Sequence, residues 1–318
     1  MIKTKLSKFL LIALMFNLSV PTTIFAQENS SDPEEIIVKG KVLYSDQVTA
    51  LKTPVPIIDV PQTLSIVTDE DIRKQGFRDL GDIVRYTPGV NTSQGEGHRD
   101  SVVFRGVRST ADFYLDGVRD DVQYYRSLYN LEQVEILRGP NALLFGRGGT
   151  GGIINRVTKK AVLDDAFGSF DMGADTFGAF DFAVDYNVQT GENSALRINF
   201  HSDTLENHRD YFDGDRYGFN PTLRVQISPQ TTLDLSYEHA DHERFIDRGV
   251  PTLNGEPVEA FEEIVFGDTD TNLTTLRADI YRANISHEFS DTQKGNFVVQ
   301  YSDFAKMYKN YYASGYSG

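Results

Sequence analysis

The most suggestive spacing in the chain is that of Gly146, Gly148 and Gly151, within the stretch VEILRGPNALLFGRGGTGGIINRVTKK. The same spacing occurs in dinucleotide-binding proteins, where the glycines follow a strand and open a helix that binds pyrophosphate. Here they lead into IINRV, whose β-branched residues predict a strand, and no Lys-Ser/Thr pair follows to make a phosphate loop. The pattern disfavours nucleotide binding and favours tight turns with close backbone approach.

Histidines are the second candidate for chemistry, because imidazole is a common metal ligand. Four histidines lie on different predicted strands or loop ends, and their spacing to one another and to carboxylates is not that of zinc sites. The four in question are His201, His208, His239 and His242. No Ser-His-Asp arrangement is recognisable, and the chain has no Cys to act as nucleophile or thiolate ligand. We therefore expect no enzyme activity, no bound metal and no cofactor.

The elements that would position any site begin with an export signal. Lys3, Lys5 and Lys8 precede an apolar run from Phe9 to Val20, and Ala26 suits the last position before cleavage. This layout predicts a secretory signal over residues 1–26, in preference to a buried N-terminal helix.

Residues 27–52 are polar except for PEEIIVKGK, which holds one potential strand from Ile36 to Val38. A lone strand is unstable in water. Such a segment can add itself to the sheet edge of a partner, but on its own chemistry an ordinary linker is the favoured interpretation.

Residues 53–162 predict a compact α+β domain. Thr68 can cap a first helix that Gly76 ends, and a second helix is expected from Phe77 to Tyr86. Short strands follow in SVVFRGV, ADFYLDGV and VEILRG, between turns rich in Gly and Asp.

From residue 163 onward, segments such as FDFAVDYNV and ALRINFHSD alternate apolar and polar residues. This period predicts antiparallel strands with one apolar face. Tight turns at 191–193 and 228–230 contrast with a long polar stretch at 244–275, as in a transmembrane barrel. A secreted sandwich would alternate as well, so periodicity leaves both architectures open.

Composition narrows the classes further. The 318 residues carry a net charge of -15, which argues against nucleic acid as a partner because phosphate binding needs a basic face. The segments after the signal contain no run of 18 apolar residues, so the sequence predicts no membrane-spanning helix there.

Several motifs together resemble a known family. LRGP followed by FGRGGTGGIINRVTKK is similar to the end of the plug domain of TonB-dependent receptors. PQTLSIVTDEDI, RDLGDIVRYTPGV, FRGV and YLDGV occur in the family's order, over roughly Val60 to Lys160. DFYLDGVRDDVQYYRSLYNLEQVEILRGP most resembles the branch of catecholate and hydroxamate siderophore receptors.

The resemblance implies a fold: an α+β plug followed by the first strands of a transmembrane β-barrel that has 22 strands in the family. Only about seven strands fit between residue 163 and Gly318. An open sheet with unpaired edges is unstable in a bilayer, so we expect a partial barrel from a truncated gene product or fragment that does not transport by itself.

The resemblance also assigns roles. It turns residues 34–40 into a TonB box, in which Glu35, Ile36, Ile37, Val38 and Lys39 would pair with TonB, energised by ExbB and ExbD. It places Arg105 and Arg138 where plug arginines pair with barrel glutamates, which here would lie beyond Gly318. The alternative is that both arginines bond within the plug, for example to Glu132 or Glu135.

Ligand contacts are expected from plug loops at 94–99, 108–111 and 123–126. The candidates are His98, Arg99, Arg108, Tyr124, Tyr125 and Arg126. Arginines could meet the charge of an anionic ferric siderophore and tyrosines could stack on it. Each of these residues could equally be an ordinary solvated loop residue.

The function implied is TonB-dependent import of a ferric siderophore through the outer membrane of a Gram-negative bacterium, with outer-membrane lipid around the barrel. Iron would arrive inside its chelator. The alternatives are a receptor of the same family for haem, cobalamin or a saccharide, and a secreted β-rich enzyme, for which the sequence offers no acid/base constellation.

Overall fold

The computed structural model describes residues 62–313, except for 94, 111, 141–144 and 146–148. The chain divides into two units, 1–42 and 43–318, and every described residue lies in the second. The predicted signal at 1–26 and the predicted TonB contacts from Glu35 to Lys39 therefore lie outside the described residues.

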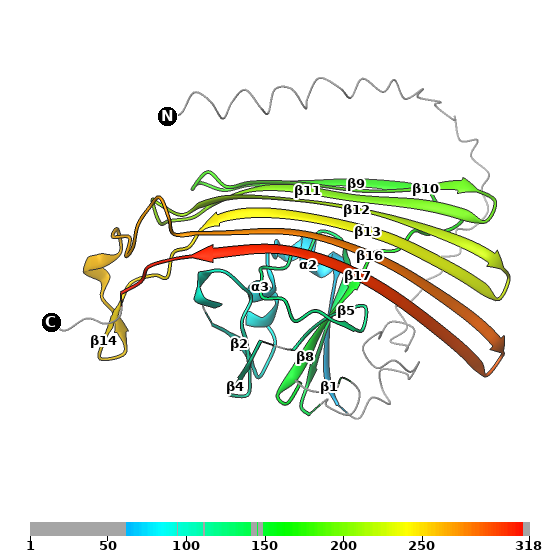
Figure 1. Ribbon diagram of the computed structural model, residues 1–318, viewed down its shortest axis with the longest axis horizontal. Helices are drawn as coiled ribbons and strands as arrows, with labels where there is room; N and C mark the ends of the chain where they lie inside the picture. Colours follow the sequence, from blue (N-terminus) through cyan, green and yellow to red (C-terminus); the bar gives the residue numbers. More distant parts are fainter. Residues whose placement is uncertain (1–61, 94, 111, 141–144, 146–148, 314–318) are drawn as a thin grey trace, which may run out of the picture. The chain divides into compact units, whose positions relative to one another are not determined.

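Among the described residues up to Thr158 there are two short helices and two small sheets (Figure 1). The helices are α2 (Asp69–Gln75) and α3 (Leu80–Arg85), with a 3-10 turn η3 (Gly95–Gly97). The five-stranded sheet has the order β1 (Thr63–Thr68), β7 (Leu131–Arg138), β8 (Gly152–Thr158), β5 (Phe113–Leu115), β6 (Val118–Arg119). The three-stranded sheet runs β2 (Val90–Thr92), β3 (Val102–Phe104), β4 (Val107–Ser109). The α+β prediction is thus confirmed.

Local chemistry explains where α2 begins and ends. The Thr68 hydroxyl accepts a hydrogen bond from the Asp71 amide at 3.2 Å, and the Asp71 carboxylate accepts one from the Thr68 amide at 3.0 Å. This reciprocal pair is a capping box. Gly76 ends the helix with φ 63°, a left-handed conformation that glycine adopts without strain.

The second helix starts later than the sequence indicated. It was expected from Phe77 but begins at Leu80, because the Asp79 carboxylate accepts a hydrogen bond from the Asp82 amide at 3.1 Å and so caps the helix there. Leu80, Ile83 and Val84 share one helix face and are buried.

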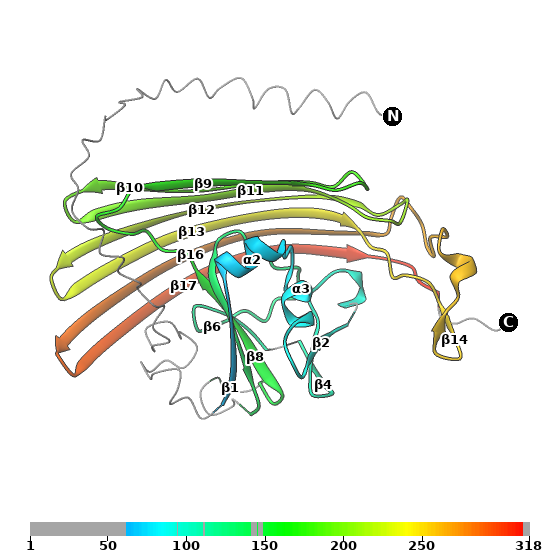
Figure 2. The same cartoon turned by 180° about the vertical axis from the view of Figure 1, so that it is seen from behind.

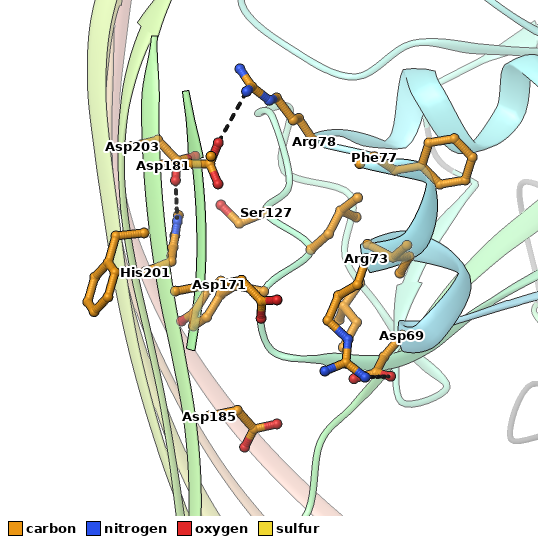
Figure 3. Close-up of a pocket in the computed structure, with 18 of the residues that line it drawn as sticks. Asp69, Arg73, Phe77, Arg78, Ser127, Asp171, Asp181, Asp185, His201 and Asp203 are labelled. Carbon is orange, nitrogen blue, oxygen red and sulfur yellow. Dashed lines mark hydrogen bonds and ion pairs between the residues drawn. The ribbon is translucent and has the colours of Figure 1, made fainter. Parts of the chain in front are cut away.

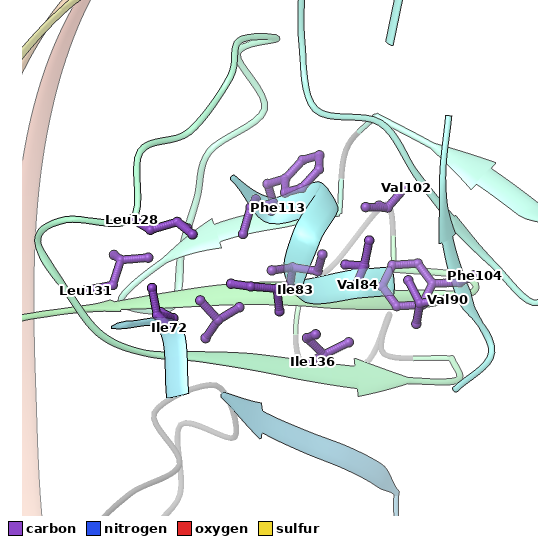
Figure 4. Packing of buried hydrophobic residues seen from close by; sticks show 13 residues of the cluster. Ile72, Ile83, Val84, Val90, Val102, Phe104, Phe113, Leu128, Leu131 and Ile136 are labelled. Atoms are coloured by element: carbon purple, nitrogen blue, oxygen red, sulfur yellow. The ribbon is translucent and has the colours of Figure 1, made fainter. Parts of the chain in front are cut away.

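These helix residues meet the inner strand residues in one apolar core (Figure 4). The cluster consists of Ile72, Leu80, Ile83, Val84, Val90, Val102, Phe104, Phe113, Leu128, Leu131, Val134, Ile136 and Ile154. Gly152 shows how close its packing is, since an added Cβ would lie 2.5 Å from Phe104 Cδ1 and 2.6 Å from the Leu137 carbonyl oxygen. The glycine-rich stretch serves close backbone approach here, as its sequence suggested.

A seven-stranded antiparallel sheet follows, and Figure 2 shows it from behind. Its strands are β9 (Phe167–Ala174), β10 (Phe180–Gly191), β11 (Ser194–Glu206), β12 (Asp213–Ser228), β13 (Thr231–Phe245), β16 (Leu273–Ser290) and β17 (Gln293–Lys309). Each pairs with the next, so β9 and β17 are the edges within the described residues. β14 (Thr252–Leu253), β15 (Glu256–Pro257) and η4 (Glu259–Phe261) lie in the long connection between β13 and β16.

The connections of this sheet alternate in length. Two-residue turns at 192–193, 229–230 and 291–292 join strands at one rim. The opposite rim carries 175–179, 207–212 and 246–272, and we call it the long-loop rim. Short turns on one rim and long loops on the other are typical of outer-membrane barrels, where the long loops face outward.

The polarity of the sheet's two faces settles the architecture that periodicity left open. Polar side chains are buried along the face toward the plug, including Asn187, Asn199, Asn220, Thr222 and Asn284. Large apolar side chains are exposed on the other face, including Tyr186, Phe219, Leu235, Tyr281, Ile285 and Val299. A sandwich would bury its apolar face, whereas a membrane barrel turns it outward. The strands are therefore those of a barrel wall.

The helices of the described residues are short, and none is long and apolar enough to cross a membrane.

Candidate functional site at the long-loop end of the plug

Two plug segments contact the large sheet near the long connection between β13 and β16. Gly97, with φ 75°, lies so close to the connection after β13 that an added Cβ would be 2.6 Å from Ile246 Cγ2 and 3.3 Å from the Asp247 carbonyl oxygen. The second segment, 121–127, packs Tyr124 against Leu276 and Ala278 of β16. We call the surface formed there by Glu96, His98, Arg99, Arg248, Lys306 and Tyr308 the apex patch.

His98 is the centre of this patch. Its side chain is buried and stacks on the Tyr308 ring, with centroids 3.9 Å apart and an interplanar angle of 15°. Lys306 Nζ donates to His98 Nδ1 at 2.7 Å and also contacts the Gln123 carbonyl oxygen. Burial, reinforced by the Lys306 charge, lowers the pKa of His98. The ring is therefore neutral, with its proton on Nε2 facing Glu96 Oε2 at 3.3 Å.

Arg126 lies beneath the patch in a buried cluster of charges. Its Nε donates to Asp120 Oδ2 at 2.9 Å, and its backbone amide donates to Asp100 Oδ2 at 3.0 Å. Arg156 Nη2 donates to the same Asp120 oxygen at 2.6 Å, and the Tyr124 hydroxyl donates to it at 2.9 Å. We call Asp100, Asp120, Tyr124, Arg126 and Arg156 the Arg126 cluster.

Backbone oxygens complete the coordination of Arg126. Its Nη2 donates to the carbonyls of Asp120 at 2.9 Å and Val122 at 2.8 Å, and its Nη1 donates to that of Tyr124 at 3.2 Å. The guanidinium lies 4.0 Å from the Phe113 ring centroid. Since one side chain holds three carbonyls of the same segment, it fixes the shape of the 120–126 loop.

The pKa values of the two carboxyl groups in the cluster are shifted in opposite directions. Burial alone would raise the pKa of Asp120, but Arg126 and Arg156 outweigh it and lower that pKa below its ordinary value. Burial raises the pKa of Asp100 to about 6, because Arg126 offsets the burial only in part and Asp79 adds repulsion. Burial likewise raises the pKa of Tyr124, which keeps its phenol protonated as a donor.

Asp100 should make the plug more stable in mild acid. Its pKa in the folded state, about 6, exceeds the unfolded value of about 3.9, so the folded state binds its proton first. The stabilisation is complete below about pH 4 and is lost as pH rises through 6, with a size on the order of 2–3 kcal/mol. Asp100→Asn should flatten this dependence between pH 4 and 7, measured as the midpoint of plug unfolding. An unchanged slope in the variant would assign the effect to another group.

The structure separates the six predicted ligand residues. His98 and Arg99 belong to the apex patch, and the Tyr125 ring lies under the Arg244 guanidinium at 3.9 Å. Tyr124 and Arg126 are 5% and 1% exposed, so they shape the loop from inside. Arg108 lies exposed in β4, and no contact among the described residues joins it to the other five.

Arg105 and Arg138 stand apart from this site. Arg138 donates to the Pro88 carbonyl oxygen at 2.6 Å and to Ser65 Oγ at 2.7 Å, so it bonds within the plug, though to neither of the expected glutamates. Glu135 instead accepts from Gln133 and Asn155, both at 2.8 Å. Arg105 is an exposed turn residue with φ 47°. Their pairing with barrel glutamates stays a prediction.

The sequence analysis expected plug arginines to pair with glutamates of the sheet. It missed ion pairs of the reverse kind, in which a carboxylate of the plug pairs with an arginine of the sheet. Arg282 of β16 pairs with Asp116, which also accepts from the Thr158 amide at 2.9 Å. Arg197 of β11 lies 3.7 Å from Glu132. The available signal was the presence of arginines at polar positions of the alternating strands, facing the plug.

A second group of contacts joins the end of the plug to β10 and β11. Asp185 receives Arg197 Nε at 2.8 Å and Nη2 at 2.7 Å, a bidentate pair, and Lys159 Nζ at 3.0 Å. Lys159 also lies 3.4 Å from Asp69 of α2. One buried wall carboxylate thus ties together two cations from separate elements.

Between α2 and strands β9–β12 lies a cavity of about 340 Å³, shown in Figure 3. Cations line it, and aspartates already neutralise them. Arg78 reaches Asp181 at 3.1 Å and Arg73 reaches Asp69 at 3.3 Å. His201 stacks on Tyr129 at 4.1 Å between centroids. The cavity is a polar gap between plug and wall.

The histidines do not assemble a metal site in the described part of the chain, where no group of three or more His, Asp or Glu side chains is placed to hold an ion. His239, for example, bonds Asp279 at 2.8 Å on the neighbouring strand.

Residues 56–153 match the family model of the TonB-dependent Receptor Plug Domain. This part of the chain is therefore similar to the plug domain of TonB-dependent receptors. It is 35% identical over 205 residues to the probable TonB-dependent receptor BfrD of Bordetella pertussis, covering 63% of this chain and 28% of that protein. It is 29% identical over 313 residues to the ferrioxamine B receptor of Salmonella typhimurium LT2, covering 92% of this chain and 43% of that protein.

Solved structures agree on the fold. The open form of the ferric-catecholate import receptor Fiu from Escherichia coli K12 superposes with a TM-score of 0.76 at 23% identity, over 85% of this chain and 42% of that one. The siderophore receptor PiuA from Acinetobacter baumannii gives the same TM-score over 83% and 39%. The chain thus spans less than half the length of the curated relatives and solved structures named here. All of them are receptors, not enzymes.

Proposed function

We propose that this chain forms the plug and the first wall strands of an outer-membrane receptor that imports a ferric siderophore with energy from TonB. The relatives support the ligand class, since they include a ferrioxamine B receptor and a ferric-catecholate import receptor. In this proposal residues 1–26 direct export, 27–52 form the periplasmic leader, 53–162 the plug and 163–318 the wall.

The observation that carries the proposal is the polarity of the two faces of the seven-stranded sheet. The face toward the packed plug is polar, and the opposite, exposed face is apolar. The exposed apolar face suits outer-membrane lipid. The polar face is occupied by plug side chains, through pairs such as Asp116 with Arg282. A plug domain that packs against the polar face of such a wall would block a pore. Import would then require a mechanism that moves or rearranges the plug.

The same proposal assigns that mechanism to residues 34–40, where Glu35, Ile36, Ile37, Val38 and Lys39 would add as a strand to TonB, itself energised by ExbB and ExbD. Backbone hydrogen bonds supply the affinity in strand addition, so the mode needs an extended β-prone segment more than particular side chains. Iron enters already chelated, so the chain needs no metal ligands of its own.

Deletion of residues 34–40 tests the coupling. In a strain without other siderophore receptors, the natural gene should restore growth on at least one ferric siderophore as sole iron source. The deletion should abolish that growth while the affinity of isolated outer membranes for the same chelate stays within about twofold, because binding and energy coupling use separate surfaces.

A matched deletion of residues 43–49 shortens the same leader and should leave uptake intact. Uptake that survives the 34–40 deletion would remove that segment from the TonB role. Indifference to every ferric siderophore, together with restored growth on haem or uptake of cobalamin, would refute the ligand class.

A further inference from the structure

The proposed function does not say which charge the bound ferric chelate has, and the residues of the apex patch bear on this question. Resting on that function, we propose that the patch selects ferric chelates that are anionic and carry flat aromatic groups over cationic hydroxamate chelates, with Lys306 and Tyr308 as specificity-determining residues. Neither residue was singled out by sequence reasoning, because both lie on β17, the last described strand.

The charge argument begins with Lys306. Its ammonium group bonds only neutral acceptors, His98 Nδ1 at 2.7 Å, the Gln123 carbonyl oxygen and the His98 carbonyl oxygen at 3.4 Å. Among the described residues no carboxylate lies within ion-pair distance of it. No carboxylate of the described residues therefore compensates its positive charge at the rim, although the net charge of the whole chain is -15.

Two arginines extend this positive field. Arg244 of β13 lies over the Tyr125 ring at 3.9 Å, and no described carboxylate pairs with it either. Arg99 reaches Glu96 at 3.7 Å through Nη2, while its Nε and Nη1 are buried without an acceptor. Because those two nitrogens are covered, Arg99 contributes its positive charge to the patch and no direct hydrogen bond to a chelate. Glu96 is the patch's one carboxylate, and it is already engaged by His98 and Arg99.

Aromatic surface lies beside these cations. Tyr308 is 52% exposed, although one face of its ring stacks on His98. Beyond the end of β17, Tyr311 and Tyr312 are 55% and 58% exposed, and Arg248 lies 4.5 Å from the Tyr312 centroid. Aryl groups of a chelate can stack on such rings, and an anionic aryl chelate satisfies rings and cations together. A cationic chelate would meet Lys306 and Arg244 with repulsion.

The cavity of Figure 3 shows no such preference, because each of its cations is already paired with an aspartate. Arg78 with Asp181 at 3.1 Å and Lys159 with Asp185 at 3.0 Å are examples. Anion selection therefore belongs to the apex patch.

The test measures affinity in outer membranes from cells that express the natural gene, with two probes: a trianionic ferric tris-catecholate and a monocationic ferric trihydroxamate. We expect the tris-catecholate to bind at least tenfold more tightly at low salt. We also expect this preference to shrink as salt rises to about 0.5 M, where charges are screened over a few ångströms.

Lys306→Gln should weaken tris-catecholate binding about tenfold, the scale of one lost charge-assisted contact, and change trihydroxamate binding less than twofold. Lys309→Gln is the matched control, since it removes the same charge from the other face of the same strand and should change neither. Tyr308→Ala should weaken the tris-catecholate, and Tyr308→Phe should restore it because the ring is kept. Folding of each variant is checked by its heat-dependent mobility on gels.

Equal affinity for the two probes, or tighter binding of the cationic one, would overturn the inference while leaving the receptor function intact. Equal losses from Lys306→Gln and Lys309→Gln would overturn it as well. Failure to bind any ferric siderophore would refute the receptor function and the inference with it.

Discussion

Replacing Arg126 by methionine is expected to destabilise the plug by about 3–5 kcal/mol, which is the usual cost of removing one partner from a buried ion pair. Arg126 is 1% exposed and neutralises Asp120 at 2.9 Å, with Asp100 at 3.4 Å. Without it, three backbone carbonyls lose their donor and Asp100 loses the one cation within ion-pair distance in the described part of the chain. Asp120 keeps Arg156 at 2.6 Å, which limits the damage on that side.

Proteolysis of the receptor in its membrane, at increasing urea, gives the free energy of plug opening for each variant. Arg85→Met is the matched control, because Arg85 is an exposed residue of the last turn of α3 and should cost less than about 0.5 kcal/mol. Arg126→Lys should recover only part of the loss, since an ammonium cannot reach both carboxyls and the carbonyls in the fork geometry of a guanidinium. A stable Arg126→Met plug would show that the cluster is dispensable.

Replacing Asp185 by leucine is expected to loosen the plug from its wall. Asp185 is 8% exposed and is the shared partner of Arg197 and Lys159. The change therefore removes the nearest carboxylate from two buried cations at once. Arg197 keeps Glu132 at 3.7 Å and Lys159 keeps Asp69 at 3.4 Å, contacts too long to replace what is lost. We expect a cost of about 3 kcal/mol or more, felt between the plug and the strands β10 and β11.

The readout is the sensitivity of cells to an antibiotic too large to pass a receptor whose plug is seated. Asp185→Leu should raise that sensitivity, and Asp185→Asn should have a smaller effect because its amide oxygen still accepts one hydrogen bond. Asp171→Leu on the neighbouring strand β9 is the control, since Asp171 is exposed and pairs with no cation in the described part of the chain. Equal sensitivity of the Asp185 and Asp171 variants would place the seating of the plug elsewhere.

Local features of this protein could be predicted from sequence because the interactions that make them are local. Thr68 and Gly76 bound α2 through hydrogen bonds and a backbone conformation that involve their immediate neighbours. The start of α3 was misplaced at Phe77 because the sequence analysis did not consider Asp79, whose side chain caps the helix and sets its start at Leu80. The order of the plug motifs indicated the resemblance to TonB-dependent receptors, because each motif is short and can be recognised without knowledge of its contacts in the fold.

The candidate site was only half predictable. The sequence pointed to the loops around His98 and Arg126, but it treated Arg126 as a surface residue. Its burial depends on Asp100 and Asp120, whose positions follow from the folding of the whole 100–126 segment. Lys306 and Tyr308 were missed because they follow His98 by some two hundred residues and meet it only when β17 has paired into the wall.

The sequence by itself determined that strands with a two-residue period follow residue 163, because that period is a property of the extended backbone. It could not determine which face is buried, since alternation is the same in a sandwich core and in a lipid-facing wall. Only the tertiary structure decided this, by placing Asn187 and Asn220 against the plug and Phe219 and Tyr281 on the exposed side. The reason is physical: a side chain's position along a strand is fixed by its own backbone, but the medium it faces is fixed by what the rest of the chain brings to that face.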